Sequence, residues 1–247
     1  MKLALVQMIV VQENPKNNLQ KIISYIKRAS KMGAKIILFP EAALTDYVSE
    51  THKFAQDVPN GPACRAVWKL AERLKVYVSF GLIEKHGIHV YITQVFLGPN
   101  KFNYKYRKTW LYSTTDSIKS KRRHRNEPDY FDPGNGPEIF NIAGLKSTCM
   151  ICADSAAPRC LQIIKKLKPQ IVFFPNNVEL WKSEEHFANI ARKCDAPLLI
   201  ANRVGTSWGE KCEGGSAVFS KSGKLLAEAN KKNKEEIVLF DLKRLGL

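Results

Sequence analysis

The chain has 247 residues, of which 45% are hydrophobic and 25% are charged. These proportions are typical of a soluble globular protein, and a chain of this length buries enough apolar surface to fold without a disulfide or metal staple. The net charge of +16 favours contact with anions, but no basic stretch carries aromatic residues at a stacking spacing, which excludes the recognisable nucleic-acid-binding modules and leaves a solvated basic surface as the simpler interpretation.

The first predicted element is an apolar, β-branched strand at residues 3–11. Its opening run, Leu3 to Val6, is too short to span a membrane, and no small-residue cleavage site follows it, so neither a membrane anchor nor a signal peptide is expected. Apolar residues at helical spacing predict a helix at 17–32, which ends before Gly33. Residues 35–39 form a continuous apolar run, which is typical of a strand covered on both faces.

The rest of the chain alternates between apolar runs typical of strands and apolar residues at helical spacing. Further strands are predicted at residues 76–83, 89–97, 171–174, 198–201, 216–219, 225–229 and 237–240, and one more is predicted to end at Cys152. Further helices are predicted at 62–74, 158–167 and 184–193. The stretch 101–137 is predicted to be mostly irregular, and loops of this length are usually functional or disordered. No linker rich in Pro, Gly or Ser divides the chain, so we expect one α/β domain over residues 1–247, with two sheets and outer helices.

The six cysteines are scattered through the chain, at positions Cys64, Cys149, Cys152, Cys160, Cys194 and Cys212. Scattered cysteines in a large chain fit reduced thiols better than a disulfide framework. We therefore expect a cytoplasmic protein.

Two segments with the same pattern each end in a polar residue. Residues 35–41 and residues 170–176 are both apolar strands followed by Phe-Pro, and they end in Glu41 and Asn176. The pattern indicates either two similar β-α halves packed face to face or only the common occurrence of Pro at strand ends. In both cases the two polar residues follow the carboxyl ends of buried strands, where ligands bind in α/β proteins.

Glu41 and Cys152 are candidates for chemistry because of these positions. A carboxylate that leaves a dry sheet is suited to act as a general base. A cysteine where a strand runs into a sharp turn is exposed beside backbone N–H groups that can hold an oxyanion. Most free cysteines are simply small buried hydrophobic residues, and that interpretation suits Cys149, inside the strand, better than Cys152.

The spacing of Cys149 and Cys152 also allows half of a zinc site or a redox pair. Zinc needs two more ligands, and the chain has no second Cys-x-x-Cys and no His-x-x-x-His. A redox pair normally opens a helix, whereas this pair is predicted to lie along a strand.

Three short segments occur in a characteristic order: Phe39-Pro40-Glu41, then Tyr106-Arg107-Lys108, then Ile151-Cys152-Ala153-Asp154. This order resembles the nitrilase superfamily of carbon–nitrogen hydrolases, and the resemblance runs nearly from end to end. It extends to residues 3–7, Gly61-Pro62, residues 80–84, Glu127 with residues 130–134, residues 201–205 and residues 214–216.

The resemblance implies a four-layer α-β-β-α sandwich and an amidase that needs no cofactor or metal. It implies Cys152 as nucleophile, Glu41 as general base, Lys108 as the cation facing the oxyanion and Glu127 as a second carboxylate. The backbone N–H of Ala153 would complete the oxyanion site. For Lys108 the resemblance is the whole argument, because residues 101–125 hold nine Lys or Arg and one acid, and composition alone indicates only a basic loop.

The segment after the nucleophile departs from the family's pattern. Asp154 and Pro158 fit, but the small residues 155–157 stand where the family has Arg and bulky residues, and Arg159 stands where it has an acid. This leaves the substrate open, and the small side chains leave room for a larger acyl group. Asn177 and Trp181 stand where the family often places substrate contacts, although Trp181 equally suits packing at a helix start.

Three functions are therefore compared. The first is hydrolysis of a small-molecule amide or carbamoyl amide through a cysteine thioester, and the second is a nitrile hydrolase or acyltransferase on the same fold. The third is a basic, non-catalytic binding protein, although neither nucleic acid nor a membrane is the expected partner. By resemblance, we also expect a homodimer or a larger homo-oligomer.

Overall fold

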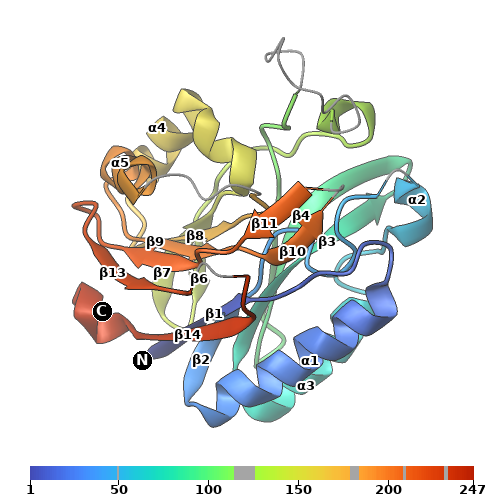
Figure 1. The fold of residues 1–247 in the computed structure, drawn as a ribbon, viewed down its shortest axis with the longest axis horizontal. Helices are drawn as coiled ribbons and strands as arrows, with labels where there is room; N and C mark the ends of the chain where they lie inside the picture. The colour runs from blue at the N-terminus through green and yellow to red at the C-terminus, as the bar shows by residue number, and fades with distance from the viewer. Residues whose placement is uncertain (49, 114–125, 179–183, 208–209, 231–232) are drawn as a thin grey trace.

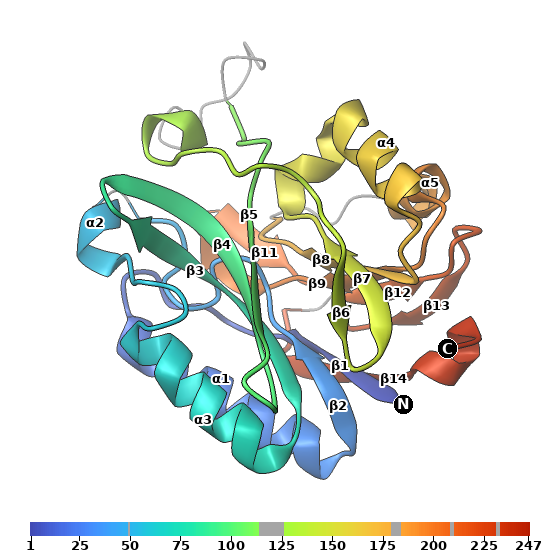
Figure 2. The same ribbon diagram turned by 180° about the vertical axis from the view of Figure 1, so that it is seen from behind.

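The computed structural model describes residues 1–48, 50–113, 126–178, 184–207, 210–230 and 233–247. Two six-stranded sheets lie face to face, with helices on both outer sides (Figure 1). Helices α1 (Pro15–Lys31) and α3 (Pro62–Leu74) cover one sheet, and α4 (Pro158–Leu167) and α5 (Glu184–Cys194) cover the other (Figure 2). The predicted four-layer α-β-β-α sandwich is confirmed.

The strand orders of the two sheets are alike. The first sheet runs in the order β14 (Glu236–Asp241), β1 (Lys2–Gln7), β2 (Ala34–Leu38), β3 (Tyr77–His86), β4 (His89–Leu97) and β5 (Asn103–Arg107). The second runs in the order β13 (Leu225–Glu228), β12 (Ala217–Phe219), β9 (Leu198–Ala201), β8 (Ile171–Pro175), β7 (Leu145–Cys149) and β6 (Phe140–Ile142). Strands β10 (Val204–Ser207) and β11 (Glu210–Glu213) form a separate two-stranded sheet. A short helix, α2 (Thr51–Phe54), precedes α3.

Each sheet contains three adjacent parallel strands, β1–β2–β3 in one and β7–β8–β9 in the other. β5 also runs parallel to β3, because each of them pairs antiparallel with β4. The carboxyl ends of parallel strands open onto one edge of a sheet, so the residues that follow β2, β5, β7, β8 and β9 are brought to common edges.

Alternating side chains of the strands build three apolar layers. In β1, Leu3 and Leu5 point between the sheets, whereas Ala4 and Val6 point to the helix layer of α1 and α3. A third cluster lies between the second sheet and helices α4 and α5. Both faces of the central strands are therefore dry, and this explains their continuous apolar runs. Each large apolar side chain that is fully buried contributes about 1.5–3 kcal/mol.

Several boundaries differ from the predictions. The first strand ends at Gln7 and not at residue 11, because its antiparallel partner β14 begins opposite Gln7, at Glu236. The strand expected to reach Cys152 ends at Cys149. β5 lies inside the stretch expected to be irregular; the charged residues Lys105 and Arg107 alternate along it, so it carries no apolar run. Residues 114–125 of that stretch lie outside the described residues.

The hairpin β10–β11, β6 and α2 were not predicted. None of the described helices has the length and apolar character needed to span a membrane.

Substitution of Phe173 tests the apolar layer between the two sheets. Its buried ring lies 5.2 Å from the Phe96 ring and 6.1 Å from the Phe140 ring, centroid to centroid. Phe173→Ala is expected to lower the free energy of unfolding by about 3–5 kcal/mol, because it removes apolar burial and leaves a cavity. Urea unfolding measures this loss, with Ile88→Ala as control, since Ile88 is 85% exposed. Equal losses in the two variants would contradict this account of the core.

The buried carboxyl of Glu84 is expected to make the stability of the fold depend on pH. Burial raises the pKa of this carboxyl, but hydrogen bonds from Arg107, Lys105 and Thr93 outweigh burial and bring the pKa below its ordinary value of 4.5. The ionised carboxyl thus stabilises the fold above that value, and the contribution is lost as the pH falls through the folded-state pKa. The stability difference between wild type and Glu84→Gln is expected to be largest at neutral pH and to shrink in acid. Urea titrations at several pH values check this, and a difference independent of pH would refute it.

Candidate active site

The turn after β2 places Glu41 in the interior, where the residue is 1% exposed. The turn packs directly on β3, and Leu44 N donates to Gly81 O at 3.0 Å. A Cβ on Gly81 would lie 2.2 Å from Ala42 N, so only glycine allows this approach. Ala42 itself has φ +49°, a left-handed conformation that an L-residue rarely adopts. Glu41 is therefore held by backbone packing.

Cys152 follows β7 and opens a short 3-10 helix, Cys152–Ala156. Its φ of +42° is a strained conformation for a non-glycine residue, and such strain costs about 1–3 kcal/mol and gathers at functional sites. Cys152 is half-buried, whereas the other five cysteines are buried. Ala153 is the second residue of this helix, where a backbone N–H has no acceptor within the helix.

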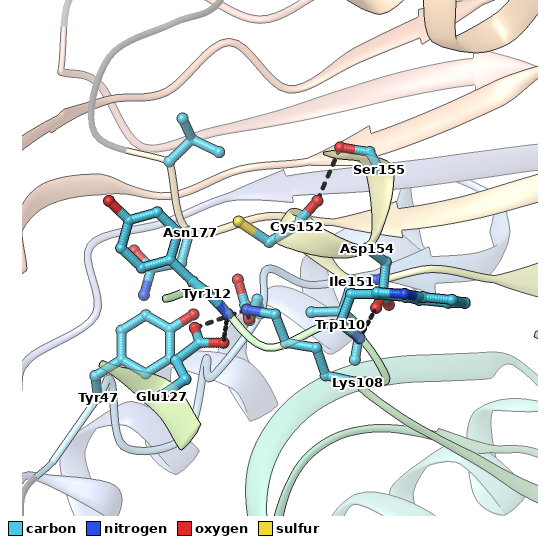
Figure 3. A network of polar contacts seen from close by, with 12 residues as sticks. Tyr47, Lys108, Trp110, Tyr112, Glu127, Ile151, Cys152, Asp154, Ser155 and Asn177 are labelled. Carbon is cyan, nitrogen blue, oxygen red and sulfur yellow. Dashed lines mark hydrogen bonds and ion pairs between the residues drawn. The ribbon is translucent and has the colours of Figure 1, made fainter. Parts of the chain in front are cut away.

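Lys108 comes directly after β5 and is fully buried. Its Nζ donates to Glu41 Oε1 at 2.9 Å and to Glu127 Oε1 at 2.7 Å. Glu127 opens a second short 3-10 helix, Glu127–Asp129, and its Oε2 accepts from Tyr112 N at 2.7 Å. Figure 3 shows Lys108, Glu127, Tyr112 and Cys152 gathered around one space. The structure thus brings together the four residues predicted to be catalytic.

The charges of this group decide its protonation. Burial lowers the pKa of Lys108, but Glu127 and Glu41 outweigh burial and raise it, so the ammonium stays charged. Burial raises the pKa of Glu127, and Glu41 raises it further; Lys108 lowers it but does not cancel the rise. Two buried carboxylates beside one ammonium leave a net negative charge, which favours uptake of a proton by the group.

The thiol of Cys152 is neutral in this setting. Burial raises its pKa most, and Glu41 raises it further, while Lys108 and the backbone N–H of Asn177 lower it. A neutral thiol needs a base before it can attack carbon, since the thiolate is the nucleophile.

One oxygen of Glu41 is suited to take that proton. Glu41 Oε2 is buried and accepts no hydrogen bond from the described residues, whereas both oxygens of Glu127 are occupied. An unpartnered buried carboxylate oxygen is costly, so such an atom is expected where a reacting group must approach.

Asn177 lies after β8, and its side-chain amide contacts Asp46. Its Nδ2 donates to Asp46 Oδ1 at 3.0 Å, and the same oxygen accepts from Ser207 Oγ at 2.8 Å. Asp46 Oδ2 lies 2.6 Å from Arg203 Nη1 in an ion pair whose side chains are both fully buried. The turn that follows Glu41 is thus braced against loops of the second sheet.

Sequence reasoning missed Tyr47 and the brace at Asp46. The Tyr47 ring lies 5.9 Å from Lys108 Nζ, and burial, then Glu127 and Glu41, raise its pKa well above the usual value. Neither residue carries a sequence signal, because both become significant only through contacts across the sheets. Trp181, the other predicted substrate contact, lies outside the described residues. Among the described residues, no cluster of His, Cys, Asp or Glu could hold a metal ion.

The family of the chain follows from comparison with known proteins. The sequence model of the carbon-nitrogen hydrolase family matches residues 2–245. The chain belongs to the carbon-nitrogen hydrolase family. It is 29% identical over 239 residues to a nitrilase of Pyrococcus abyssi, with 95% of this chain and 87% of the relative covered. It is 26% identical over 257 residues to an omega-amidase of Bos taurus, covering 99% of this chain and 90% of that one.

Solved structures share the fold of this carbon–nitrogen hydrolase. An amidase from Nesterenkonia sp. superposes with a TM-score of 0.83 at 21% identity, covering 98% of this chain and 90% of that one. A carbon–nitrogen hydrolase superfamily protein from Xanthomonas campestris superposes with a TM-score of 0.82 at 17% identity, covering 100% and 92%.

Gly81→Ala tests the packing that places Glu41. The added methyl group collides with the backbone at Ala42 and must displace the turn that carries Glu41. The variant is expected to lose at least about 100-fold in carbon–nitrogen hydrolysis, because displacement by about 1 Å can cost this much. Steady-state rates of product release measure the loss, and circular dichroism checks that the variant is folded. Gly87→Ala is the control, since a Cβ at Gly87 meets nothing within 4 Å and its cost is limited to the strain of a φ of +62° in the β3–β4 turn. Full activity of folded Gly81→Ala would contradict the prediction.

Proposed function

We propose that the chain hydrolyses a non-peptide amide or carbamoyl amide of a small molecule through a thioester on Cys152. The observation that carries this proposal is the free Glu41 Oε2 in a buried site that also holds a neutral thiol and the Lys108 ammonium. A carboxylate base with one unpartnered oxygen, a thiol that needs a base and a fixed cation are the three parts that acyl transfer requires.

In the first step Glu41 takes the thiol proton as the sulfur of Cys152 attacks the carbonyl carbon of the amide. The carbonyl oxygen becomes an oxyanion, which the Lys108 ammonium and the N–H of Ala153 stabilise. Removal of one such donor typically costs about 3–4 kcal/mol of transition-state stabilisation. The oxyanion then collapses, the carbon–nitrogen bond breaks, and Glu41 gives its proton to the leaving ammonia or amine.

In the second step a water molecule replaces the departed amine. Glu41 removes a proton from the water as it attacks the thioester carbon, and the same donors stabilise the second oxyanion. Collapse of that intermediate breaks the carbon–sulfur bond, releases the carboxylic acid and returns the proton to the thiolate. Glu127 keeps the Lys108 ammonium in place through both steps.

The names of the relatives support an amide substrate. An omega-amidase and an (R)-stereoselective amidase are among the proteins similar to the chain. One solved structure, of a mutant of the Nesterenkonia amidase, carries a Michael addition product of acrylamide on the active-site cysteine, which supports a cysteine nucleophile. A nitrile is the second candidate substrate, favoured by the similarity to the nitrilase of Pyrococcus abyssi. A homodimer or larger homo-oligomer is also proposed for the chain, by resemblance to the family.

A panel of short amides, carbamoyl amines and nitriles, scored by ammonia release, tests the proposal. Wild type is expected to release ammonia from an amide or a carbamoyl amine. Cys152→Ala is expected to lose all measurable activity, because no nucleophile remains, while Cys149→Ala, which changes a buried cysteine of β7, should keep it.

Two outcomes would overturn the proposal. Equal rates of wild type and Cys152→Ala would remove the cysteine mechanism, and turnover of nitriles alone would replace the amide substrate. Mass spectrometry of wild type during turnover is expected to find the acyl group on Cys152 and thereby to identify the substrate's acid part.

A further inference from the structure

The carboxylate of Asp154 is the meeting point of two distant segments. It is fully buried in the short helix that begins with Cys152. Its Oδ1 accepts from Thr109 N at 3.0 Å and from Trp110 N at 2.7 Å. Its Oδ2 accepts from Ile151 N at 2.8 Å and from Tyr106 Oη at 2.8 Å. Four donors from both sheets therefore share one side chain.

Those donors flank the candidate catalytic residues directly. Ile151 precedes Cys152, while Thr109 and Trp110 follow Lys108. Figure 3 shows the contacts of Asp154 with Trp110 and Ile151, and it shows the sulfur of Cys152 turned away from Asp154 toward Asn177. Asp154 thus lies behind the reacting atoms, outside the space that a substrate would occupy.

Capping of the short helix does not account for all of these bonds. A cap requires only the bond from Ile151 N, three residues before Asp154. The bonds from Thr109 and Trp110 join Asp154 to residues 45 and 44 positions earlier in the chain, on the segment that continues β5 of the other sheet. The two sheets do not need this polar link in order to pack together, since they already meet through the apolar layer between them.

The ionised carboxylate suits this set of donors. All three backbone partners are N–H groups, which can only donate, so each needs an acceptor lone pair. The described residues provide no ion pair for Asp154, so four hydrogen bonds compensate its burial. An asparagine of the same shape would turn an NH₂ group toward at least one N–H donor.

We propose that Asp154 is a positioning residue that fixes the distance between the Lys108 ammonium and the Cys152 thiol by clamping the segments next to them. The inference rests on the proposed function, because it assigns a role within that site. Loss of the clamp lets the segment after β5 and the turn at Cys152 move independently. Oxyanion stabilisation and thiol activation then fail together, although all four proposed catalytic side chains are still present.

The experiment compares Asp154→Asn with Glu84→Gln. Both changes turn a fully buried carboxylate into its amide, and through Arg107 Glu84 also contacts the strand that leads to Lys108. Its partners Thr93, Lys105 and Arg107 all lie on β4 and β5, however, so Glu84→Gln leaves the link between β5 and the turn at Cys152 in place. The first readout is the rate at which iodoacetamide alkylates Cys152, which requires no substrate. The second is kcat and KM on the amide that wild type hydrolyses fastest, at temperatures where thermal melting shows each variant to be folded.

Asp154→Asn is expected to lower both the alkylation rate and kcat by about 10- to 100-fold, with KM changed less than about threefold, since misplacement affects the reaction more than binding. Glu84→Gln is expected to lower the melting temperature but to keep both rates. Rates of folded Asp154→Asn within about threefold of wild type would overturn the proposal, and so would equal losses in Glu84→Gln.

A milder variant covers failure of Asp154→Asn to fold. Tyr106→Phe removes one of the four donors, and it is expected to slow alkylation several-fold; an unchanged rate would overturn the clamp. Failure of the amidase proposal is recognised separately. In that case wild type itself releases no ammonia from any amide, while the comparison of alkylation rates still decides whether Asp154 positions the thiol.

Discussion

The structure of the site depends on one buried ammonium held between two buried carboxylates. Removal of an ion from water costs several kcal/mol, and only close, well-directed partners compensate that cost. Lys108 has such partners in Glu41 and Glu127, which lie 67 and 19 positions away in the chain. To supply them, the fold must bring the end of β2, the end of β5 and a short helix to one point.

The frame that holds this group is a pair of sheets packed through apolar layers. Three dry layers fix the two sheets, and Glu41, Lys108 and Cys152 each stand within three residues of the end of a strand. The backbone of these turns adopts conformations that local preference disfavours, with positive φ at Ala42, Asp46 and Cys152. Such conformations persist where the surroundings over-determine them. At Asp46 the surroundings include the buried Arg203, and next to Ala42 they include the bare backbone of Gly81.

A site residue could be predicted from the sequence when its immediate neighbours in the chain mark its position. The ends of buried apolar runs identify Glu41 and Cys152 as candidates, because the exit from a dry sheet can be read from a few neighbours. Lys108 and Glu127 have no such signal, since a buried lysine and a surface lysine look alike in a basic stretch. Their assignment came from the order of motifs shared with the carbon-nitrogen hydrolase family. β5 was missed because its charged residues contact the buried Glu84, a partner on another strand.

The sequence by itself determined the layers, because a strand buried on both faces must be apolar at every position and a covering helix must be apolar along one side. It also determined the order in which the reactive residues occur. Only the tertiary structure decided which oxygen of Glu41 is free, that Asn177 turns its amide to Asp46, and that Asp154 joins the two sheets behind Cys152. These features are contacts between distant segments, and hydrogen-bond geometry over such separations is set by packing and not by the residues next in the chain.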